Sequence, residues 1–359
     1  MNYFENISDE ELKIKIDEII NEVNKISKQN QTPSGFTIAN TKKYYGNIMP
    51  YFPPIRETRD IVCGNVIIYT EKQAKEIAKY LDGKVEYIIV DSEKKILPTE
   101  YGINDAGNIE LALSEIKKSK ALTFKANDLT VSAIDALIAN KYSPLGGRKV
   151  AIIGAGNIGS KIALTLLERG ARPVLYRRNV EKLEAIVKAL NTIKPEGTIS
   201  FAEYSISLEE ACNNAEIIIG CTPGIPIINK ECVSKMKELG IIIDIGKGSI
   251  YKEAIEYAIS NKIDVIRADI RAGFFGTIST IFETKNLLEN IMGSKAINGI
   301  QIASGGIMAK EGTVIVDNYK SPKKIIGISN GCGDFKRTLS DDEKNNLEKL
   351  KWIMSKGHA

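Results

Sequence analysis

Three glycines in the middle of the chain have the spacing of a phosphate-binding turn. The run Gly154-Ala155-Gly156-Asn157-Ile158-Gly159 lies between an apolar segment at Lys149–Ile153 and a helical pattern at Ile158–Arg169. In such a turn the first glycine permits the tight bend, the second admits ligand oxygens to the backbone, and the third lets helix and strand pack closely. Exposed amides at the helix start would then receive a pyrophosphate. The residues expected to bind it are Gly154, Gly156, Asn157, Ile158 and Gly159.

The end of the next strand indicates which dinucleotide fits. Proteins that bind NAD carry Asp or Glu there, which bonds the ribose hydroxyls and repels a 2′-phosphate. This chain has no acid at that point and reads Tyr176-Arg177-Arg178-Asn179. Two guanidinium groups could clamp a phosphate or stack on adenine, although they could also be solvated surface charges. We therefore expect NADP in preference to NAD, bound by Tyr176, Arg177 and Arg178.

Two further strands end in small residues. They lead into Cys221-Thr222-Pro223-Gly224 and Asp244-Ile245-Gly246-Lys247. The carboxyl ends of parallel strands meet at the edge where a nicotinamide ring would lie, so Cys221, Thr222, Pro223 and Gly246 are expected beside it. Cys221 could also be a nucleophile, but no neighbouring base is evident, and a packed thiol is the favoured interpretation.

Apolar runs repeat around the glycine turn with the spacing of alternating strands and helices. Six such runs predict a complete doubly wound Rossmann sheet in an α/β domain in the C-terminal half. They are Val150–Ile153, Pro173–Tyr176, Ile199–Glu203, Glu216–Cys221, Ile241–Ile245 and Val265–Ala268.

A smaller α/β domain precedes the glycine turn and is the expected substrate domain. Helices of this length between strands indicate parallel β-α-β units. The strands are expected at Val66–Tyr69, Val85–Val90 and Ala121–Phe124, and the helices at Glu71–Leu81 and Asn108–Lys117. A helix at Thr130–Asn140 would link this domain to the next, because Ser143-Pro144-Leu145-Gly146-Gly147 breaks it.

The two ends of the chain differ in character. Residues 8–29 have the pattern of an amphipathic helix with Ser8 and Glu11 as a capping box, and residues 31–60 are expected to be an irregular ordered loop. After a helix near Thr277–Met292, hairpins replace β-α-β units. The hairpin strands are expected at Gly299–Ser304, Thr313–Asp317 and Lys324–Ser329, the first two joined by Gly305-Gly306. The predicted segments are 1–55 (N-terminal helix and loop), 56–145 (substrate domain with linker helix), 146–295 (Rossmann domain) and 296–359 (β-rich extension and C-terminal helix).

Composition narrows the classes of partner. Forty-nine Lys and Arg against forty-five Asp and Glu leave a net charge of +4, spread along 359 residues, so nucleic acid is not indicated. No apolar run approaches the roughly 18–20 residues of a membrane span, and we expect a cytoplasmic protein with a small-molecule substrate that could form a homodimer. Five scattered cysteines indicate reduced thiols and no metal site. The only histidine, His358, is next to last, so a mechanism needs another base.

One run places the chain near known enzymes. Lys125-Ala126-Asn127-Asp128, followed by a helix, a Gly-Gly turn and the glycine turn, resembles the shikimate dehydrogenases with their Asn-Thr-Asp element. Tyr176-Arg177-Arg178-Asn179 is similar to their Asn-Arg-Thr, and Cys221-Thr222-Pro223-Gly224 to their Ala-Thr-Pro. Methylenetetrahydrofolate dehydrogenases and glutamyl-tRNA reductases share this order of domains. The Ser-x-Ser-Pro and lysine motifs of shikimate dehydrogenases are absent, so the chain is no clear member of any one of these families.

The resemblance implies that Asp128 contacts the substrate, with Asn127 beside it and Lys125 at a strand end facing the cleft between the domains. A lysine next to an aspartate can act as an acid pair for hydride transfer without histidine. A solvated lysine and a helix-capping aspartate are the alternatives. Lys42 and Tyr45, in the early loop with Lys43 and Tyr44, are further candidates for substrate binding.

Together these features predict an NADP-dependent oxidoreductase, a dehydrogenase or reductase, that acts on a C=O or C=N bond of a small polar metabolite. Two alternatives stay open. One is a non-catalytic nucleotide-sensing or scaffold protein, because a fold does not fix an activity. The other is a cysteine-dependent aldehyde dehydrogenase or reductase that uses Cys63 or Cys221.

Overall fold

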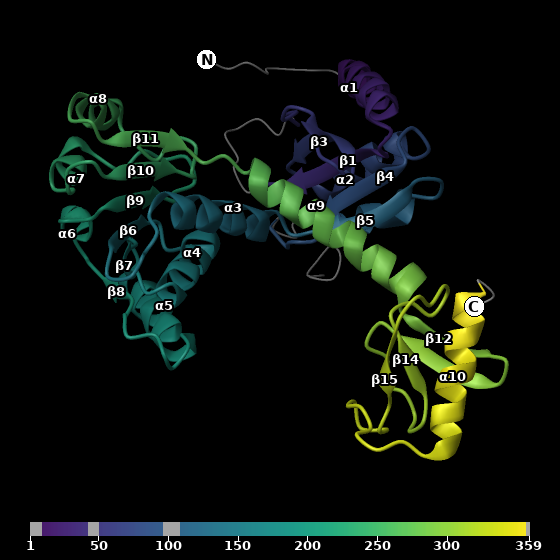
Figure 1. Cartoon of the computed structure of the whole chain (residues 1–359). Coiled ribbons are helices and arrows are strands. Elements are labelled where there is room, and N and C mark those ends of the chain that lie inside the picture. Colours follow the sequence, from purple (N-terminus) through teal and green to yellow (C-terminus); the bar gives the residue numbers. More distant parts are fainter. Residues whose placement is uncertain (1–8, 42–49, 96–107, 357–359) are drawn as a thin grey trace. The chain divides into compact units, whose positions relative to one another are not determined.

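The computed structural model describes residues 9–41, 50–95 and 108–356 (Figure 1). Its contacts divide into two compact units, Met1–Thr277 and Ile278–Ala359. The larger unit holds a five-stranded and a six-stranded sheet, and the smaller unit holds a four-stranded one. No helix in the described ranges combines the length and the apolar character that a membrane span requires.

The first sheet of the larger unit has the strand order β2-β3-β1-β4-β5. Four strands run parallel, and the short β2 pairs with β3 in the antiparallel sense. The strands are β1 (Ser34–Asn40), β2 (Arg56–Glu57), β3 (Val62–Ile68), β4 (Tyr87–Asp91) and β5 (Lys120–Phe124). The helices are α1 (Asp9–Asn30), α2 (Glu71–Leu81), the 3₁₀ helix η1 (Asn108–Glu115) and α3 (Ala126–Lys141).

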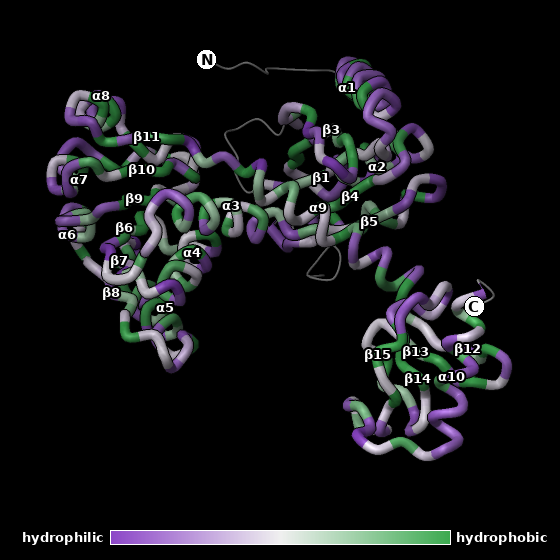
Figure 2. Tube along the Cα trace, in the orientation of Figure 1, coloured by the Kyte–Doolittle hydropathy of each residue, from purple (hydrophilic) through white to green (hydrophobic). Residues whose placement is uncertain are grey.

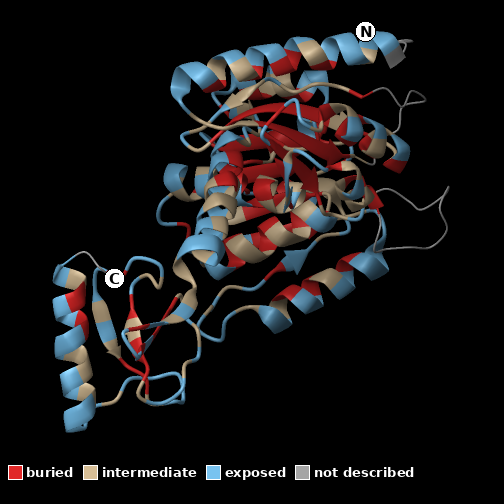
Figure 3. Cartoon of the chain, turned by 90° about the vertical axis from the view of Figure 1, so that its right-hand side faces the viewer, coloured by how far each residue is buried: buried red, intermediate tan, exposed pale blue. Residues whose placement is uncertain are grey.

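The helices of this domain bury one face each. Polar and apolar residues alternate along α1 (Figure 2), and its apolar face, with Ile16, Ile20 and Val23, joins the core of the first sheet. The predicted bounds of α2 are confirmed, because Thr70 and Gln73 form a complete capping box at its start. The inner strands β1, β3 and β4 are almost wholly buried (Figure 3), whereas the edge strand β5 is mostly exposed.

β1 corrects the prediction of an irregular loop over residues 31–60. It is the central strand of the first sheet, hydrogen-bonded to β3 and β4, and six of its seven residues are buried. Gly35 packs closely there, since a Cβ would lie 2.5 Å from Cδ1 of Ile61 and 3.0 Å from Sγ of Cys63 and these side chains would have to shift. The buried Thr37 hydroxyl donates to Oδ1 of Asn65 at 2.7 Å. Parallel neighbours on both sides therefore outweigh the proline and glycine signals of this segment.

The second sheet is the predicted doubly wound one, with the order β11-β10-β9-β6-β7-β8 and parallel pairing throughout. Its central strands are continuous apolar runs, as expected of strands covered on both faces. The strands are β6 (Lys149–Ile153), β7 (Arg172–Tyr176), β8 (Glu203–Tyr204), β9 (Ile217–Gly220), β10 (Ile241–Asp244) and β11 (Asp264–Arg267). The helices are α4 (Asn157–Glu168), α5 (Val180–Ile193), α6 (Leu208–Cys212), α7 (Lys230–Ser234) and α8 (Lys252–Ser260).

The edge strand β8 is shorter and later than the predicted run Ile199–Glu203. Ile199 is 92% exposed, so its side chain adds nothing to the core. The segment is instead tied down by Asn191, whose side chain accepts from the amide of Ala202 and donates to its carbonyl oxygen, both at 2.8 Å. The apolar content of this run was a misleading signal of a strand.

The smaller unit contains a mixed sheet of order β12-β13-β14-β15 under one helix. Leu350 and Ile353 of the helix pack on the strands. The strands are β12 (Gly293–Ile297), β13 (Ile300–Ser304), β14 (Val314–Val316) and β15 (Ile325–Ile328), and the helix is α10 (Asp341–Ser355). α9 (Arg271–Asn286), followed by a π-helical turn at Leu287–Ile291, runs across the boundary between the two units.

The predicted pairing of the late strands is partly wrong. β13 and β14 are parallel, so Gly305-Gly306 is not a hairpin turn. The hairpin joins β12 to β13 through Asn298 and Gly299, whose φ angles of 48° and 82° are those of a two-residue turn. β14 and β15 form the second antiparallel pair, as predicted. The strand signal of β12, a short run containing Gly293 and Lys295, was too weak to detect from the sequence.

Candidate active site

The glycine turn joins β6 to α4, and each of its glycines meets a different constraint. Gly154 has a φ of 112°, and a Cβ there would lie 2.8 Å from the carbonyl oxygen of Cys221. A Cβ on Gly159 would collide with the carbonyl oxygen of Gly154, so helix and strand approach too closely for a side chain. A Cβ on Gly156 would meet no atom of the described residues within 4 Å. The space over Gly156 is open to a ligand, as a bound pyrophosphate requires.

The start of α4 faces this open space. Gly156 is its N-cap and makes no side-chain capping bond, which leaves the first-turn amides without a side-chain partner. Arg177, directly after β7, folds back so that its Nη1 donates to the carbonyl oxygen of Ala155 at 2.8 Å. A cavity of about 340 Å³ covers the region and is lined by the turn together with Tyr176, Arg177 and Arg178. The charge and shape of this cavity suit an anionic group.

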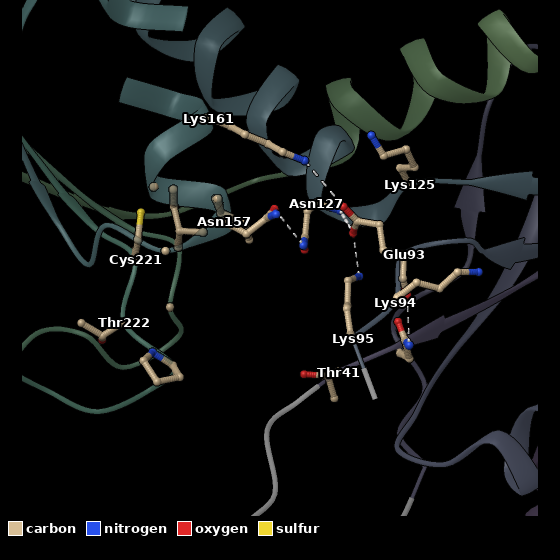
Figure 4. Close-up of a pocket in the computed structure, with 17 residues that line it drawn as sticks. Thr41, Glu93, Lys94, Lys95, Lys125, Asn127, Asn157, Lys161, Cys221 and Thr222 are labelled. Atoms are coloured by element: carbon tan, nitrogen blue, oxygen red, sulfur yellow. Dashed lines mark hydrogen bonds and ion pairs between the residues drawn. The ribbon is translucent and has the colours of Figure 1, made fainter. Parts of the chain in front are cut away.

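A larger cavity of about 730 Å³ lies at the carboxyl ends of both parallel sheets (Figure 4). It shares Gly156, Cys221, Thr222 and Pro223 with the smaller cavity. From the second sheet it is lined by Gly156–Gly159, Lys161, Cys221–Pro223, Ile245 and Gly246, and from the first by Asn40, Thr41, Glu93–Lys95, Lys125 and Asn127.

Lys95 and Glu93 form an ion pair on the wall of this cavity. Lys95 Nζ lies 3.0 Å from Oε2 of Glu93 and 2.6 Å from Oδ2 of the fully buried Asp91. The side chains of Lys95 and Glu93 are only 12% and 10% exposed. Oε2 of Glu93 also accepts from the amide of Asn127 at 2.8 Å. These bonds fix the lysine ammonium at the cavity, where bulk water screens its charge little.

Asp128 lies between two lysines. It makes ion pairs with Lys125 of the same helix turn and with Lys161 of α4. Lys161 also lies 3.8 Å from Oε1 of Glu93, so it connects the two carboxylates. Loss of hydration would raise the pKa of Asp128, but hydrogen bonds from both lysines outweigh it and lower that pKa. The bond to Asp128 in turn raises the pKa of Lys125.

Neutral amides complete the wall. Nδ2 of Asn127 donates to Oδ1 of Asn157 at 3.2 Å, which joins the starts of α3 and α4. Asn40, at the end of β1, is 4% exposed and donates to Oδ1 of Asn108 at 3.0 Å. Among the residues that the structure describes, its own Oδ1 has no hydrogen-bond donor. A buried acceptor without a donor at a cavity wall is a place for a polar ligand group.

The predicted site residues are distributed as follows. Each of the twelve predicted cofactor residues, including Cys221 and Gly246, lines the larger cavity, the smaller cavity or both. Lys125 and Asn127 line the larger one, whereas Asp128 does not. Lys42 and Tyr45 lie outside the described residues. The placement of these side chains leaves their catalytic and substrate-binding roles as predictions.

Neither Cys63 nor Cys221, the two candidate nucleophiles, offers a thiolate to a substrate at neutral pH. Burial raises the pKa of Cys221 to about 12, with a further contribution from the charge of Asp244. Burial also raises the pKa of Cys63, which is fully enclosed. Since only the thiolate is the nucleophile, this arrangement does not support the cysteine-dependent alternative.

Sequence reasoning missed the charged group at the end of β4. Asp91 is the last residue of this apolar strand and Glu93 and Lys95 follow it, at the edge where active-site residues of parallel sheets gather. Acidic and basic residues at alternate positions after a buried strand were the available signal. Lys161 was missed because it lies one turn into α4, where a lysine is more often solvated.

The fold and these two cavities define the class of protein: it binds a nicotinamide dinucleotide in a Rossmann domain of the dehydrogenase kind. Residues 138–270 match the sequence family "D-isomer specific 2-hydroxyacid dehydrogenase, NAD binding domain". The open space over Gly156 fits the pyrophosphate of such a cofactor. The sequence-based prediction of a dehydrogenase-type dinucleotide domain is therefore confirmed.

Relatives of the chain come from several families. Glutamyl-tRNA reductase of Methanococcus aeolicus is 26% identical over 219 residues, which are 51% of this chain and 54% of that protein. Glycerol-3-phosphate dehydrogenase [NAD(P)+] of Clostridium botulinum is 32% identical over 33% of this chain and 39% of its own length. The methylenetetrahydrofolate dehydrogenase/cyclohydrolase structure from Campylobacter jejuni covers 77% of this chain and 96% of its own, at 17% identity and a TM-score of 0.37.

The chain thus spans about half the length of the reductase that it matches. The matched proteins belong to the group of NAD(P)-dependent dehydrogenases and reductases. They do not indicate one family within that group. This confirms the prediction of a resemblance to that group without clear membership in one family.

Proposed function

We propose that this protein is an NADP-dependent oxidoreductase that reduces, or in the reverse direction oxidises, a C=O or C=N bond of a small polar metabolite. The observation that carries the proposal is the composition of the larger cavity. One wall is the turn that receives a dinucleotide, and the facing wall carries Lys95, held by Glu93 and Asp91. Dinucleotide and proton donor on opposite sides of one cavity are what hydride transfer to a carbonyl requires.

Support for NADP comes from the end of β7. No carboxylate follows Tyr176, and Arg177 already lies over the glycine turn through its bond to Ala155. Asn179 is used locally, because its side chain accepts from the amide of Lys182 and caps α5. Arg177 and Arg178 are therefore the residues assigned to a 2′-phosphate, as charge-assisted donors.

The chemistry divides between cofactor and chain. A bound NADP(H) supplies or accepts the hydride. For each hydride added to the substrate carbon, one proton must reach its oxygen or nitrogen, and Lys95 Nζ is assigned to deliver it. The two carboxylates orient this ammonium, and Lys161 keeps the Glu93 side of the network in place. The amides of Asn127 and Asn157, with Oδ1 of Asn40, would bind polar groups of the substrate.

Lys95 is preferred to Lys125 as the proton donor for a physical reason. The side chain of Lys125 is 55% exposed and pairs with Asp128, which lies off the cavity lining. The side chain of Lys95 is 12% exposed and pairs with carboxylates at the cavity. Water screens charge and competes for protons at an exposed donor, so the enclosed lysine is more effective.

The test combines binding with turnover. NADPH binding is measured by fluorescence, and 2-keto acids and cyclic imines are then screened for loss of NADPH absorbance. On an active substrate, Lys95→Met should lower kcat by about a hundredfold or more, the usual contribution of a proton donor. Lys120→Met is the matched control, since Lys120 sits at the opposite end of β5 and pairs with Glu86.

Each outcome decides a different part of the proposal. If Lys125→Met loses all turnover and Lys95→Met remains active, the proton donor is instead the Lys125–Asp128 pair. Tight NADPH binding with every carbonyl and imine inert would instead favour the non-catalytic, nucleotide-sensing alternative.

A further inference from the structure

A third cavity, of about 700 Å³, adjoins the proposed active site. It shares Ile158 and Ile245 with the larger cavity and lies at the ends of β10 and β11. Its other wall is the segment from Tyr51 to Arg56 and the start of α9. Within the part of the chain that the structure describes, Ile158 is the one residue of the glycine turn that lines this cavity, and Arg177 does not line it.

The lining of the third cavity carries an excess of positive charge. Its lining cations are Arg56, Lys247, Arg267 and Arg271, and its carboxylates are Asp244 and Asp269. The difference is four positive charges minus two negative ones, or +2. Both carboxylates are already engaged, because Asp269 pairs with Arg271 and Asp244 accepts from the amides of Gly248 and Ser249. Arg267 reaches only the 4.0 Å limit of an ion pair with Asp244.

Arg56 and Lys247 stand out among these cations. Within the described part of the chain, neither has a carboxylate within 4.0 Å. Each lies against an aromatic ring instead: the Arg56 guanidinium carbon is 5.0 Å from the Phe274 ring centre, and Lys247 Nζ is 5.7 Å from that of Tyr51. A ring face orients a cation but does not neutralise it. The two cations therefore line the cavity without a directly paired carboxylate, although the charge of Asp269 acts on Arg56 from beyond that distance.

The electrostatic effect of this grouping is unfavourable without an anion. Loss of hydration lowers the pKa of Lys247, and the charges of Arg267 and Arg56 lower it further. Loss of hydration also lowers the pKa of Arg56. Lys247 keeps part of its surface exposed, so the repulsion is partly screened. A bound anion would relieve the repulsion among these cations.

The order of features along the edge of the second sheet indicates where a bound anion would lie relative to the cofactor. The strands of this sheet lie in the order β7, β6, β9, β10 and β11. Arg177 follows β7, the glycine turn follows β6, Cys221 follows β9 and Lys247 follows β10. In a doubly wound sheet the adenine end of a dinucleotide lies toward the first of these and the nicotinamide toward the last. The third cavity therefore follows the nicotinamide end, where the far end of a substrate would extend.

We propose that Arg56 and Lys247 form an oxyanion subsite that binds a carboxylate or phosphate group of the substrate. The assignment rests on the proposed function, because it places the reacting carbon in the larger cavity and the anionic group next to it. The substrate class becomes a metabolite that carries its C=O or C=N bond and an oxyanion at separate ends. Arginine supplies paired donors for such a group, and lysine a compact charge.

Direct titration of simple anions tests the subsite without an identified substrate. Inorganic phosphate and succinate are titrated calorimetrically into the full-length protein at constant ionic strength. Arg56→Gln and Lys247→Met should each raise the dissociation constant of the preferred anion by about tenfold or more. Lys247→Arg keeps the charge and should retain most of the affinity. Lys252→Met, which removes an 89%-exposed lysine at the start of α8, is the matched control.

Comparing the two anions shows which group the subsite prefers. Tighter binding of phosphate indicates a phosphate group on the substrate, and tighter binding of succinate indicates a carboxylate. NADPH fluorescence on the same variants reports the cofactor site separately and should match the unmodified protein. The subsite is overturned if the unmodified protein binds neither anion detectably. It is also overturned if Arg56→Gln and Lys247→Met bind the anions as tightly as the unmodified protein does, even if NADPH binds well. Failure of NADPH to bind the unmodified protein would overturn the proposed function instead. Circular dichroism of each variant verifies the fold.

Discussion

Gly156→Ala should weaken cofactor binding strongly without unfolding the protein. The added Cβ meets nothing within 4 Å in the part of the chain that the structure describes, and the backbone at φ −101° and ψ −161° accepts alanine. As an N-cap, alanine is less favourable than glycine by a few tenths to about 1 kcal/mol in the free energy of unfolding. Alanine also makes the unfolded chain less flexible, which stabilises the fold by about 0.4–1 kcal/mol. The free energy of unfolding should therefore change by less than about 1 kcal/mol.

Cofactor affinity should respond quite differently. The Cβ occupies the space through which pyrophosphate oxygens reach the first amides of α4. Losing one charge-assisted hydrogen bond costs about 1.5–3 kcal/mol, so NADPH affinity should fall by roughly 10- to 150-fold. Fluorescence titration measures the affinity, and urea unfolding measures the stability.

Gly159→Ala is the matched comparison within the same turn. Its Cβ would lie well under 3.0 Å from the carbonyl oxygen of Gly154, so the backbone must shift. We expect a loss of about 1–3 kcal/mol in the free energy of unfolding, as for an overpacked core. If Gly156→Ala bound NADPH within about threefold of the unmodified protein, the assignment of the pyrophosphate to this turn would be refuted.

Three further predictions follow from the site. Arg177→Ala should weaken NADPH about tenfold or more and leave NADH unchanged, and equal losses for both would contradict the 2′-phosphate assignment. Because hydrogen bonds lower the pKa of Asp128 in the fold, its ion pairs stabilise at pH 7 and that contribution disappears as pH falls through the lowered pKa. Urea unfolding should show Asp128→Asn less stable at pH 7, by under about 1 kcal/mol because the side chain is 41% exposed, and this difference should shrink as pH falls through the lowered pKa. Iodoacetamide at pH 8 should label the exposed Cys332 and spare Cys221, whose pKa is about 12, and mass spectrometry showing rapid labelling of Cys221 would revive the thiolate mechanism.

Local signals were sufficient where the chain's own pattern carried the structure. The bounds of α2 followed from Thr70 and Gln73, a capping box that needs no distant contact. The strands of the second sheet were apolar runs because both faces are covered, and five of the six lie within a few residues of prediction. Gly154, Gly156 and Gly159 predicted a cofactor turn because the first and third leave no room for a side chain and the second leaves open space for a ligand.

Short or interrupted segments were beyond such signals. β1 contains Gly35 and follows Pro33, which indicate a turn in isolation, and only hydrogen bonds to β3 and β4 make it the centre of a sheet. In the same way, β12 is defined by its pairing with β13 more than by its own residues. Strands depend on partners that are distant in sequence, so their own residues underdetermine them.

The sequence by itself therefore determined the Rossmann domain, its glycine turn and the absence of an acid after Tyr176, because each depends on residues that are neighbours in the chain. Only the tertiary structure decided which groups face the cofactor turn. Lys95 and Lys161 both reach Glu93 because the carboxyl ends of β4 and β6 open on one cavity. Arg56 and Lys247 lie 191 positions apart (247 − 56), and no local pattern could place two such distant cations in one cavity.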